Sequence, residues 1–454
     1  MKRILACILL LLPLLVPVSS SAQAQEDGSI TLLTSEVRQD CLAEVRYLAG
    51  VFSVLHSEAK VHIQSVNENE LVRQVQTLIE AGKTPDMVNA GSDLLVALGE
   101  KGLLDTAMAG QTIDRIGRSR FYTGALNMLS LSGQNGFYGI PYHGWVQGIW
   151  YRADWFEEAG LKPPTTWTAI LKAAEHFTNP EQGIYGILTG TDAEQYSEQC
   201  FTQLALANDA LMFTPDGDLI FDSPAMVETL EYYVKLARLT PPGPQTWRAR
   251  DFYFQGKLAM FFYSTFIMDD LALPGVAQDS LGGEHFPELA GTPFDPELAR
   301  NTRLAPLLTR QTPASYGIIN GFAIMKQNDP KKQETIQAFL DFLFETAQYV
   351  EWVHMAPGGM MPVLRNIDDS DSFMHDPKGV FRRYGRPKII EIISGLESIQ
   401  NFGMVQGTRH PLASIYYAEK VIPRMIHKAV FENVSAAQAV TWAAQEMRRI
   451  AAEQ

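Results

Sequence analysis

The alternation of strand and helix patterns near the start of the chain restricts its fold most strongly. The apolar run at residues 29–33 and the alternating segment 61–66 predict strands, and helical residues lead from one to the other. Apolar residues then repeat with a helical period over 71–82, and a further short strand is expected at 87–88. This order is typical of βαβ units, so the sequence predicts an α/β fold.

Helical patterns continue in the later part of the chain. Two prolines precede Thr165 and Thr166, either of which can cap a new helix. Residues 275–315 are rich in Pro, Gly and Thr and show little periodicity. Further helices are expected at residues 227–237, 336–343 and 435–454.

The first residues have the pattern of an export signal. Lys2 and Arg3 precede an apolar run at 4–18, and an Ala-x-Ala motif ends at Ala24. A transmembrane anchor is the alternative, but the run is short for a span of about 20 residues and two prolines interrupt it. We therefore expect residues 1–24 to be a cleaved signal peptide and the mature protein to be periplasmic.

Charge and cysteine content narrow the class of protein further. The chain has a net charge of -14, and removing Lys2 and Arg3 with the leader makes it more negative. An acidic chain is a poor partner for nucleic acid. Cys41 and Cys200 could pair in an oxidising compartment, but no disulfide framework is evident, and two unpaired thiols are favoured. About 430 mature residues predict two domains.

Motifs of enzymes and metal proteins are missing. The sequence holds no GxSxG, HExxH or P-loop motif, and its nine histidines do not pair at metal-binding spacing. No cofactor and no metal are therefore expected. A carboxylate pair for glycoside hydrolysis stays open, because 51 acidic residues offer many pairs and none stands out.

Four segments resemble, in order, the extracellular solute-binding proteins of ABC importers, in particular the carbohydrate-binding group that includes maltose-binding protein. The second segment, "GFYGIPYHGWVQGIWYRADWFEEAG" and its continuation, is the most specific. The third contains "FQGKLAMFFYSTF", where the family has a Gly-Lys-x-Ala-Met block. The four segments are residues 78–107, 136–175, 252–266 and 316–343.

This resemblance implies two α/β lobes joined by hinge strands, with a ligand held in the cleft between them. The crossovers would fall near 140–146, 303–309 and 357–363. The first lobe would then hold residues 25–142 and 308–358, and the second 146–303 and 362–454.

The hinge segment around Trp145 carries the main candidate ligand residues. Aromatic rings stack on the apolar faces of sugars, while polar side chains satisfy the hydroxyls around the rim. Tyr142, His143, Gly144, Trp145 and Gln147 are therefore predicted to face the cleft. The aromatic residues that follow, Trp150, Tyr151, Trp155 and Phe156, are expected in the core.

Other candidates come from the ends of strands, where open α/β sheets bind ligands. For Ser92 and Asp93, capping of the next helix is an alternative role. For Trp247, an ordinary surface position is an equal alternative. The predicted ligand residues outside the hinge segment are Ser35, Glu36, Asn89, Ser92, Asp93, Asp192, Trp247, Tyr263, Ser264, Gly359 and Met360.

The resemblance implies a monomeric periplasmic protein that captures a sugar or small glycoside by hinge closure and delivers it to ABC permease subunits in the inner membrane. A polyol, a phosphorylated polyol or another compatible solute is the first alternative ligand. A phosphate would need a basic anchor, for which Arg248, Arg250 and Arg409 are available. A secreted carbohydrate-active hydrolase is the alternative of another class, and a metal-ion carrier of related fold is a weaker one.

Overall fold

The computed structural model describes residues 28–57, 59–131, 136–283, 286–367, 369–406 and 408–453. The predicted signal peptide lies outside these residues. Within them, none of the helices is both long and apolar enough to cross a bilayer.

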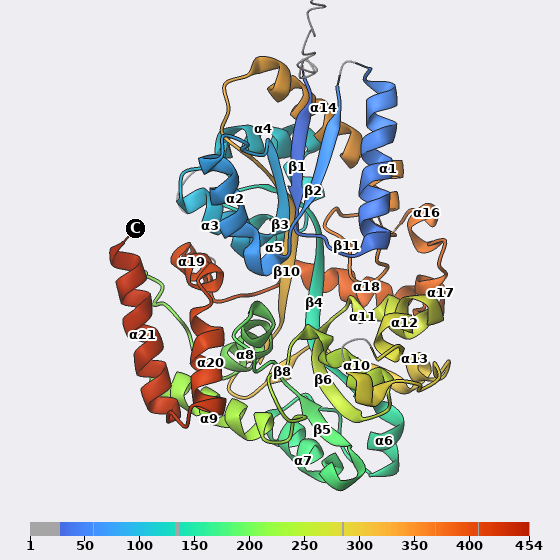
Figure 1. The fold of residues 1–454 in the computed structure, drawn as a ribbon, viewed down its shortest axis with the longest axis vertical. Coiled ribbons are helices and arrows are strands. Elements are labelled where there is room, and N and C mark those ends of the chain that lie inside the picture. Colours follow the sequence, from blue (N-terminus) through green and yellow to red (C-terminus); the bar gives the residue numbers. More distant parts are fainter. Residues whose placement is uncertain are drawn as a thin grey trace, which may run out of the picture.

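The described residues form a mixed nine-stranded sheet that runs the length of the molecule (Figure 1). Seven strands follow the order β2-β1-β3-β10-β4-β6-β5, and β7 and β11 both pair with β4. The α/β prediction is confirmed, as are the first three strands. The strands are β1 (Ile30–Thr34), β2 (Val61–Ser65), β3 (Met87–Gly91), β4 (Ile140–Arg152), β5 (Tyr185–Leu188), β6 (Leu258–Ser264), β7 (Thr302–Ala305), β10 (Tyr316–Ile324) and β11 (Met361–Pro362).

Strand β4 connects the two halves of the sheet. Its first part pairs with β10 and β11, and its second part pairs with β6 and β7. Glycines permit this crowded crossing: a Cβ at Gly317 would lie 2.1 Å from the Trp145 carbonyl oxygen, and one at Gly148 would lie 2.4 Å from that of Ala305. The backbones could not approach so closely with side chains at these positions.

One group of helices surrounds the β1-β2-β3 end, the upper half in Figure 1. Phe52 shows how they pack, because its ring contacts Phe339 and Phe342 of α14. The helices are α1 (Gln39–Leu55), α2 (Leu71–Glu80), α3 (Ser92–Glu100), α4 (Thr106–Ile116), α14 (Pro330–Phe344) and α15 (Thr346–Val353). The helices predicted between the first two strands, over 71–82 and over 336–343 are confirmed.

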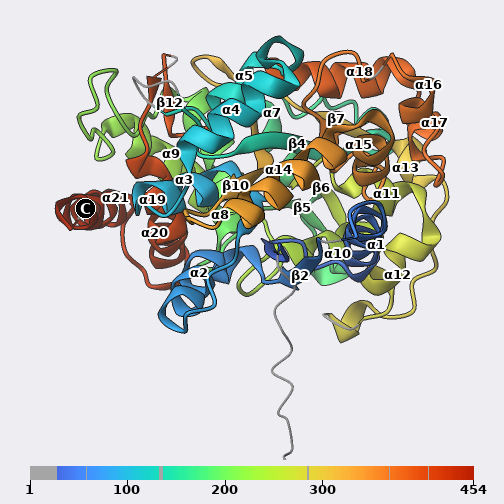
Figure 2. The same cartoon turned by 90° about the horizontal axis from the view of Figure 1, so that it is seen from above.

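A second group surrounds β5 and β6 in the lower half, and α21 lies at the outer edge of the molecule, away from α1 (Figure 2). Thr166 caps α7 by accepting a hydrogen bond from the Ala169 amide, and Ser435 forms a capping box at α21. The group comprises α6 (Ala153–Glu158), α7 (Trp167–Phe177), α8 (Gln195–Ala207), α9 (Pro224–Ala237), α10 (Arg250–Phe254), α11 (Ile267–Ala272), α20 (Val421–Phe431) and α21 (Ala436–Ala452).

Side-chain burial agrees with two further predictions. Cys41 and Cys200 are both unpaired and buried, in α1 and α8 respectively. Trp150, Tyr151 and Phe156 are buried, while Trp155 is half-buried beneath the Arg152 guanidinium. Residues 275–315, which lack periodicity, form only short elements, including α12 (Pro274–Leu281) and β7.

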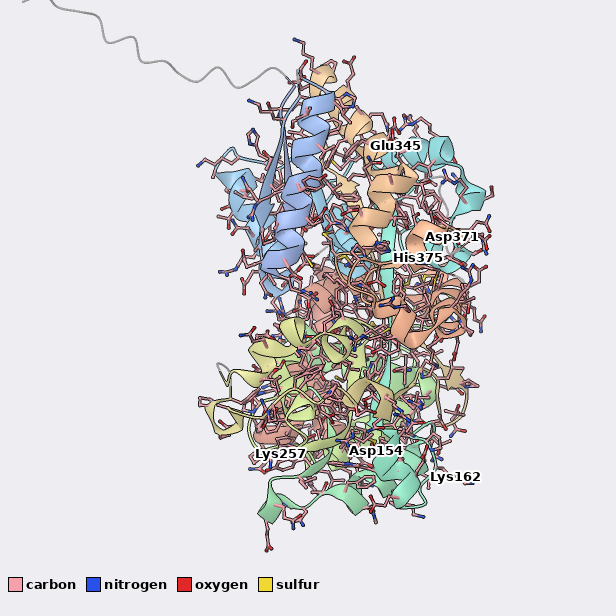
Figure 3. The ribbon with its side chains drawn as sticks, turned by 90° about the vertical axis from the view of Figure 1, so that its right-hand side faces the viewer. Asp154, Lys162, Lys257, Glu345, Asp371 and His375 are labelled. Carbon is pink, nitrogen blue, oxygen red and sulfur yellow. The ribbon has the colours of Figure 1, made fainter. Side chains whose placement is uncertain are left out.

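Part of the C-terminal region packs on the upper half, unlike the predicted range 362–454. Figure 3 shows Asp371 and His375 near Glu345, whereas Asp154 lies in the lower half. Helix α16 (Asp371–Met374) is held there because Phe373 is buried and its carbonyl contacts His354 Nε2 at 2.8 Å. Helix α19 (Leu412–Ala418) packs against α3. Sequence distance from the crossover does not decide this packing, which depends on non-local contacts.

Candidate functional site

A cavity of about 650 Å³ lies where the two halves of the sheet meet. Its volume is within the range of small-molecule sites. The connections after β1 and β2 line it from above, and β4, α8 and β6 line it from below. Ten of the sixteen predicted ligand residues line this cavity: Ser35, Glu36, Asn89, His143, Trp145, Gln147, Trp247, Tyr263, Ser264 and Met360.

Strand alternation separates the five candidates of the hinge segment. His143, Trp145 and Gln147 face the cavity, whereas Tyr142 and Gly144 lie on the opposite face of β4. The Tyr142 hydroxyl donates to the Leu343 carbonyl oxygen at 2.6 Å, inside an aromatic cluster. A Cβ at Gly144 would lie 2.7 Å from the Ile319 side chain. The period of two could have excluded these two residues from the sequence alone.

Four other predicted residues also lie away from the cavity. Ser92 and Asp93 are buried at the start of α3, and Asp93 accepts hydrogen bonds from Asn401 and Ser414. The Asp192 carboxylate accepts from the neighbouring Ala193 amide. Gly359 packs against the Phe266 ring, which leaves no room for a Cβ.

The polar wall of the cavity has spare hydrogen-bonding capacity. Burial lowers the pKa of His143 to about 3, so this imidazole is neutral, and its Nδ1 has no partner among the described residues. Gln147 Nε2 donates to the Gln199 carbonyl oxygen at 2.6 Å. Asn89, in contrast, already makes hydrogen bonds within the protein through both ends of its amide. Its Oδ1 accepts from Thr34 Oγ1, and its Nδ2 donates to the Gly321 carbonyl oxygen.

Aromatic side chains supply apolar surface to the same cavity. Trp145 is 7% exposed and meets the Tyr316 ring edge-on. Trp247 is 36% exposed, and the guanidinium carbons of Arg248 and Arg250 lie 5.0 and 5.4 Å from its ring. Trp247 is therefore an accessible platform that two cations hold in place.

The cations at the cavity already face carboxylates. Arg250 contacts Asp270 at 2.7 Å and Asp279 at 3.2 Å. Arg38 contacts Asp40 at 2.8 Å and Asp269 at 3.1 Å. Each guanidinium is thus compensated by two acidic groups.

Further carboxyl groups at the cavity give it an excess of hydrogen-bond acceptors. Burial raises the pKa of Glu36 and raises that of Glu68 to about 7. Burial also raises the pKa of Asp270 to about 7, although Arg250 opposes this shift. Such groups accept hydrogen bonds from ligand hydroxyls when ionised and can also donate one when protonated.

Two contacts join the halves beside the cavity. Arg38 precedes α1 in the upper half, and its partner Asp269 lies on α11 in the lower half. The Gln195 amide at the start of α8 donates to Asn69 Oδ1 at 3.4 Å.

Several cavity residues were missed by the sequence predictions. Glu68 and Asn69 follow β2, so the strand-end rule could have found them. Asp270 left no recognisable pattern, whereas its partner Arg250 was named only as a possible anchor for a phosphate. The other residues missed include Arg38, Tyr196, Gln199, Asn320 and Trp352.

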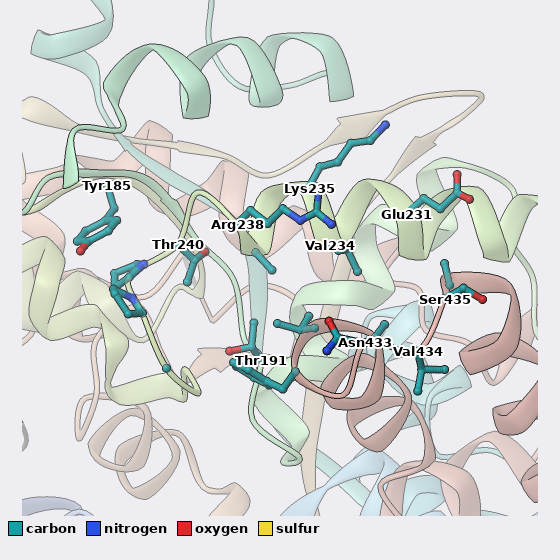
Figure 4. Close-up of a pocket in the computed structure, with 18 of the residues that line it drawn as sticks. Tyr185, Thr191, Glu231, Val234, Lys235, Arg238, Thr240, Asn433, Val434 and Ser435 are labelled. Atoms are coloured by element: carbon teal, nitrogen blue, oxygen red, sulfur yellow. The ribbon is translucent and has the colours of Figure 1, made fainter.

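A second cavity, of about 910 Å³, lies in the lower half between α9 and the α20–α21 connection. Figure 4 shows Lys235 pointing away from the loop that carries Asn433 and Val434. None of the sixteen predicted ligand residues lines this cavity. Among the described residues, no cluster of three or more His, Cys, Asp or Glu side chains suits a metal ion.

Comparisons with known proteins agree on one family. The family "Bacterial extracellular solute-binding protein" matches residues 40–350. The "Putative ABC transporter periplasmic-binding protein YcjN" of Escherichia coli K12 is 27% identical over 401 residues, which cover 88% of this chain and 87% of that protein. The mannitol-binding protein of Pseudomonas aeruginosa is 28% identical over 247 residues, 53% of each chain.

Solved structures share the fold. A solute-binding protein of Agrobacterium radiobacter K84 in complex with ribitol has a TM-score of 0.74 at 17% identity, covering 94% of this chain and 99% of that one. Maltose-bound MalE3 of T. maritima has a TM-score of 0.72 at 16% identity, covering 93% and 99%. At such identities the likeness concerns the fold.

Proposed function

Because this chain belongs to the bacterial extracellular solute-binding proteins, we propose that it captures a sugar, small glycoside or polyol in the cavity between its halves. The observation that carries the proposal is the combination of an accessible Trp247 with surrounding acceptor groups in one cavity. A ring that stacks on C–H groups and acceptors that meet hydroxyls suit a polyhydroxylated ligand. The named ligands of the related proteins, mannitol, ribitol and maltose, support the same class.

The mechanism we propose is closure of the halves around the ligand, followed by delivery to the permease subunits of an ABC importer. The first lobe we propose comprises residues 25–142 and 308–358, and the second comprises 146–303 and 362–454. Helices α16 and α19 belong to the second range by sequence but pack on the upper half. A ligand that contacts both lobes shifts the population toward the closed form. The protein acts outside the cytoplasm as a monomer, after cleavage at Ala24.

Binding without turnover fits the relatives, which are binding proteins rather than enzymes. The carboxyl groups at the cavity could also be arranged for glycoside hydrolysis. When the protein is incubated with a glycoside that stabilises its fold, a hydrolase would release cleavage products. A binding protein would leave the glycoside intact.

A thermal-unfolding screen tests the proposal directly. The mature protein is unfolded and refolded to remove carried-over ligand, and then heated with mono-, di- and trisaccharides and polyols. A ligand at 100 times its dissociation constant raises the free energy of unfolding by about 2.7 kcal/mol. We expect this rise with at least one compound and a much smaller one in Trp247→Ala, which removes the platform.

Trp442→Ala is the matched control, since this half-buried indole also lies beneath cations, Arg424 and Lys428, but does not line the cavity. It should keep the full ligand-induced rise. No rise with any compound, or equal losses in the two variants, would contradict the assignment of the cavity.

Phosphorylated ligands should fail in the same screen. Arg38 and Arg250 both face carboxylates, and Arg409 lies beside Asp93, away from the cavity. A phosphate would therefore meet an excess of negative charge. For a sugar or polyol that binds, we expect its phosphate ester to bind at least about tenfold more weakly, a cost of about 1.4 kcal/mol, as measured by calorimetry. Equal affinity for the two would point to a free basic anchor.

A further inference from the structure

A small chamber lies beside the ligand cavity, where the halves meet. Its volume is about 10 Å³, roughly the room for one water molecule. Asp93 of α3 and Glu198 of α8 both line it, and they are 5% and 4% exposed. Two carboxyl groups from different halves therefore share one space away from solvent.

Asp93 has the partners that a buried carboxylate needs. Its Oδ1 accepts hydrogen bonds from Asn401 Nδ2 at 3.0 Å and Ser414 Oγ at 2.9 Å. Burial raises the pKa of Asp93, but the Arg409 guanidinium and these two donors oppose the shift. The pKa of Asp93 is still raised, but Asp93 is the more readily ionised of the two carboxyl groups.

Glu198 has no comparable support. Its Oε2 is buried and has no hydrogen-bond partner in the described part of the chain. Burial raises the pKa of the Glu198 carboxyl well above its ordinary value, and the charge on Asp93 raises it further. Two like charges in one deeply buried chamber are unfavourable.

None of the other titratable groups described around the chamber supplies a positive charge that could pair with an ionised Glu198. Tyr316 of β10 and Tyr417 of α19 line it and are neutral, since burial raises the pKa of each well above its ordinary value. Glu68 lies near both tyrosines and adds negative charge when ionised. Arg409 acts on Asp93 electrostatically, and its guanidinium donates to the Met128 carbonyl oxygen.

We propose that this chamber is a proton-binding site in which Glu198 takes up one proton and faces an ionised Asp93. The step transfers one proton from a hydronium ion of the solvent to the Glu198 carboxylate, leaves a water molecule and breaks no bond in the protein. The protonated acid gains an O–H donor, so the two carboxyl groups attract rather than repel. Loss of the proton would drive α3 and α8 apart.

Hydrogen bonds connect this site to the ligand cavity. Gln199 follows Glu198 on α8 and lines the ligand cavity, where its carbonyl oxygen accepts from Gln147. Gln199 Nε2 donates to the Tyr417 hydroxyl at 3.0 Å, and Tyr417 lines the chamber. Proton uptake and ligand binding therefore share one turn of α8, and any coupling between them is reciprocal.

The test detects proton uptake from the pH dependence of the free energy of unfolding. It therefore does not depend on the identity of any ligand. Denaturant unfolding of the mature protein and of Glu198→Gln is measured between about pH 5.5 and pH 7.5, above the ordinary range for Glu. A carboxyl whose pKa is raised in the folded state stabilises the fold at low pH and loses that effect as pH rises. The unfolding equilibrium constant of the native chain should therefore rise about tenfold more per pH unit than that of Glu198→Gln.

Two further variants serve as a control and as an independent test of the chamber. Glu231→Gln, at an exposed position on α9, should keep the native pH dependence. Asp93→Asn removes the like charge but leaves Glu198 buried, so it should lower the pKa of Glu198 and make the profile less steep toward pH 7.5, which provides a second measurement if Glu198→Gln folds poorly. Parallel profiles for the native chain and both chamber variants would overturn the proposal. A native profile that becomes steep only when choline replaces sodium would overturn it too, because a metal cation would then occupy the chamber.

Discussion

Arg250→Gln should destabilise the protein by up to about 3–5 kcal/mol above neutral pH, because it leaves the Asp270 carboxylate buried without its counter-ion. Arg250 is 8% exposed, Asp270 is 1% exposed, and the pair is 2.7 Å apart. Replacing both partners removes the stranded charge, so Arg250→Gln combined with Asp270→Asn should recover most of the loss. Denaturant unfolding measures each free energy.

The loss of unfolding free energy caused by Arg250→Gln should also depend on pH. The pKa of Asp270 is raised to about 7, so its protonated form dominates in acid, where the loss of Arg250 matters less. As pH rises through that value, the native chain gains a paired carboxylate, whereas the loss of Arg250 raises the pKa of Asp270 further, so that the variant must keep the proton or carry an unpaired charge. The difference between Arg250→Gln and the native chain should therefore be larger at pH 8 than at pH 5.

Arg300→Gln is the control for this prediction. Arg300 pairs with Glu297 in solvent, with 81% and 58% of the two side chains exposed, so the pair contributes about 0–1 kcal/mol. A loss below 1 kcal/mol in Arg250→Gln, or one that does not change with pH, would show that water reaches Asp270.

Local patterns were sufficient to predict several elements of the fold and some of the residues that line the cavity. Periodicity identified β1, β2 and α2, and the strand-end rule placed Ser35, Glu36 and Asn89 at the cavity. The same period of two along β4 separates His143, Trp145 and Gln147 from Tyr142 and Gly144. The alternation of side chains along the strand therefore excludes Tyr142 and Gly144 from the cavity on the sequence alone.

Non-local contacts decided what the sequence could not predict. Arg38 and Asp269 are 231 positions apart, and Asp93 and Ser414 are 321 apart. Burial of Asp93 depends on α19, which follows the last predicted crossover and still packs on α3. A carboxylate after a strand looks the same in sequence whether it meets a ligand or another helix. Only the packing separates Glu36, at the cavity, from Asp93, in its own chamber.

The ion pair between Arg38 and Asp269 gives the prediction with the largest expected effect on ligand affinity. Asp269 has no exposed side-chain surface, and apart from Arg38 its carboxylate accepts from the Asp270 amide. Truncating one partner of a buried, hydrogen-bonded charge pair costs about 2–5 kcal/mol. Separation of the halves would let water reach Asp269, so the cost falls mainly on the closed form. Arg38→Gln should therefore weaken ligand binding by at least about thirtyfold.

Calorimetry with the ligand found in the screen measures this loss, and solution scattering should show a larger radius of gyration for the unliganded variant. Lys378→Gln is the matched control, because Lys378 also pairs with Asp40, at 3.7 Å, but makes no contact with Asp269. Exchanging the charges, with Arg38→Asp and Asp269→Arg together, should restore part of the affinity. If Arg38→Gln and Lys378→Gln bind alike, the ion pair does not hold the halves together, and closure depends on the ligand alone.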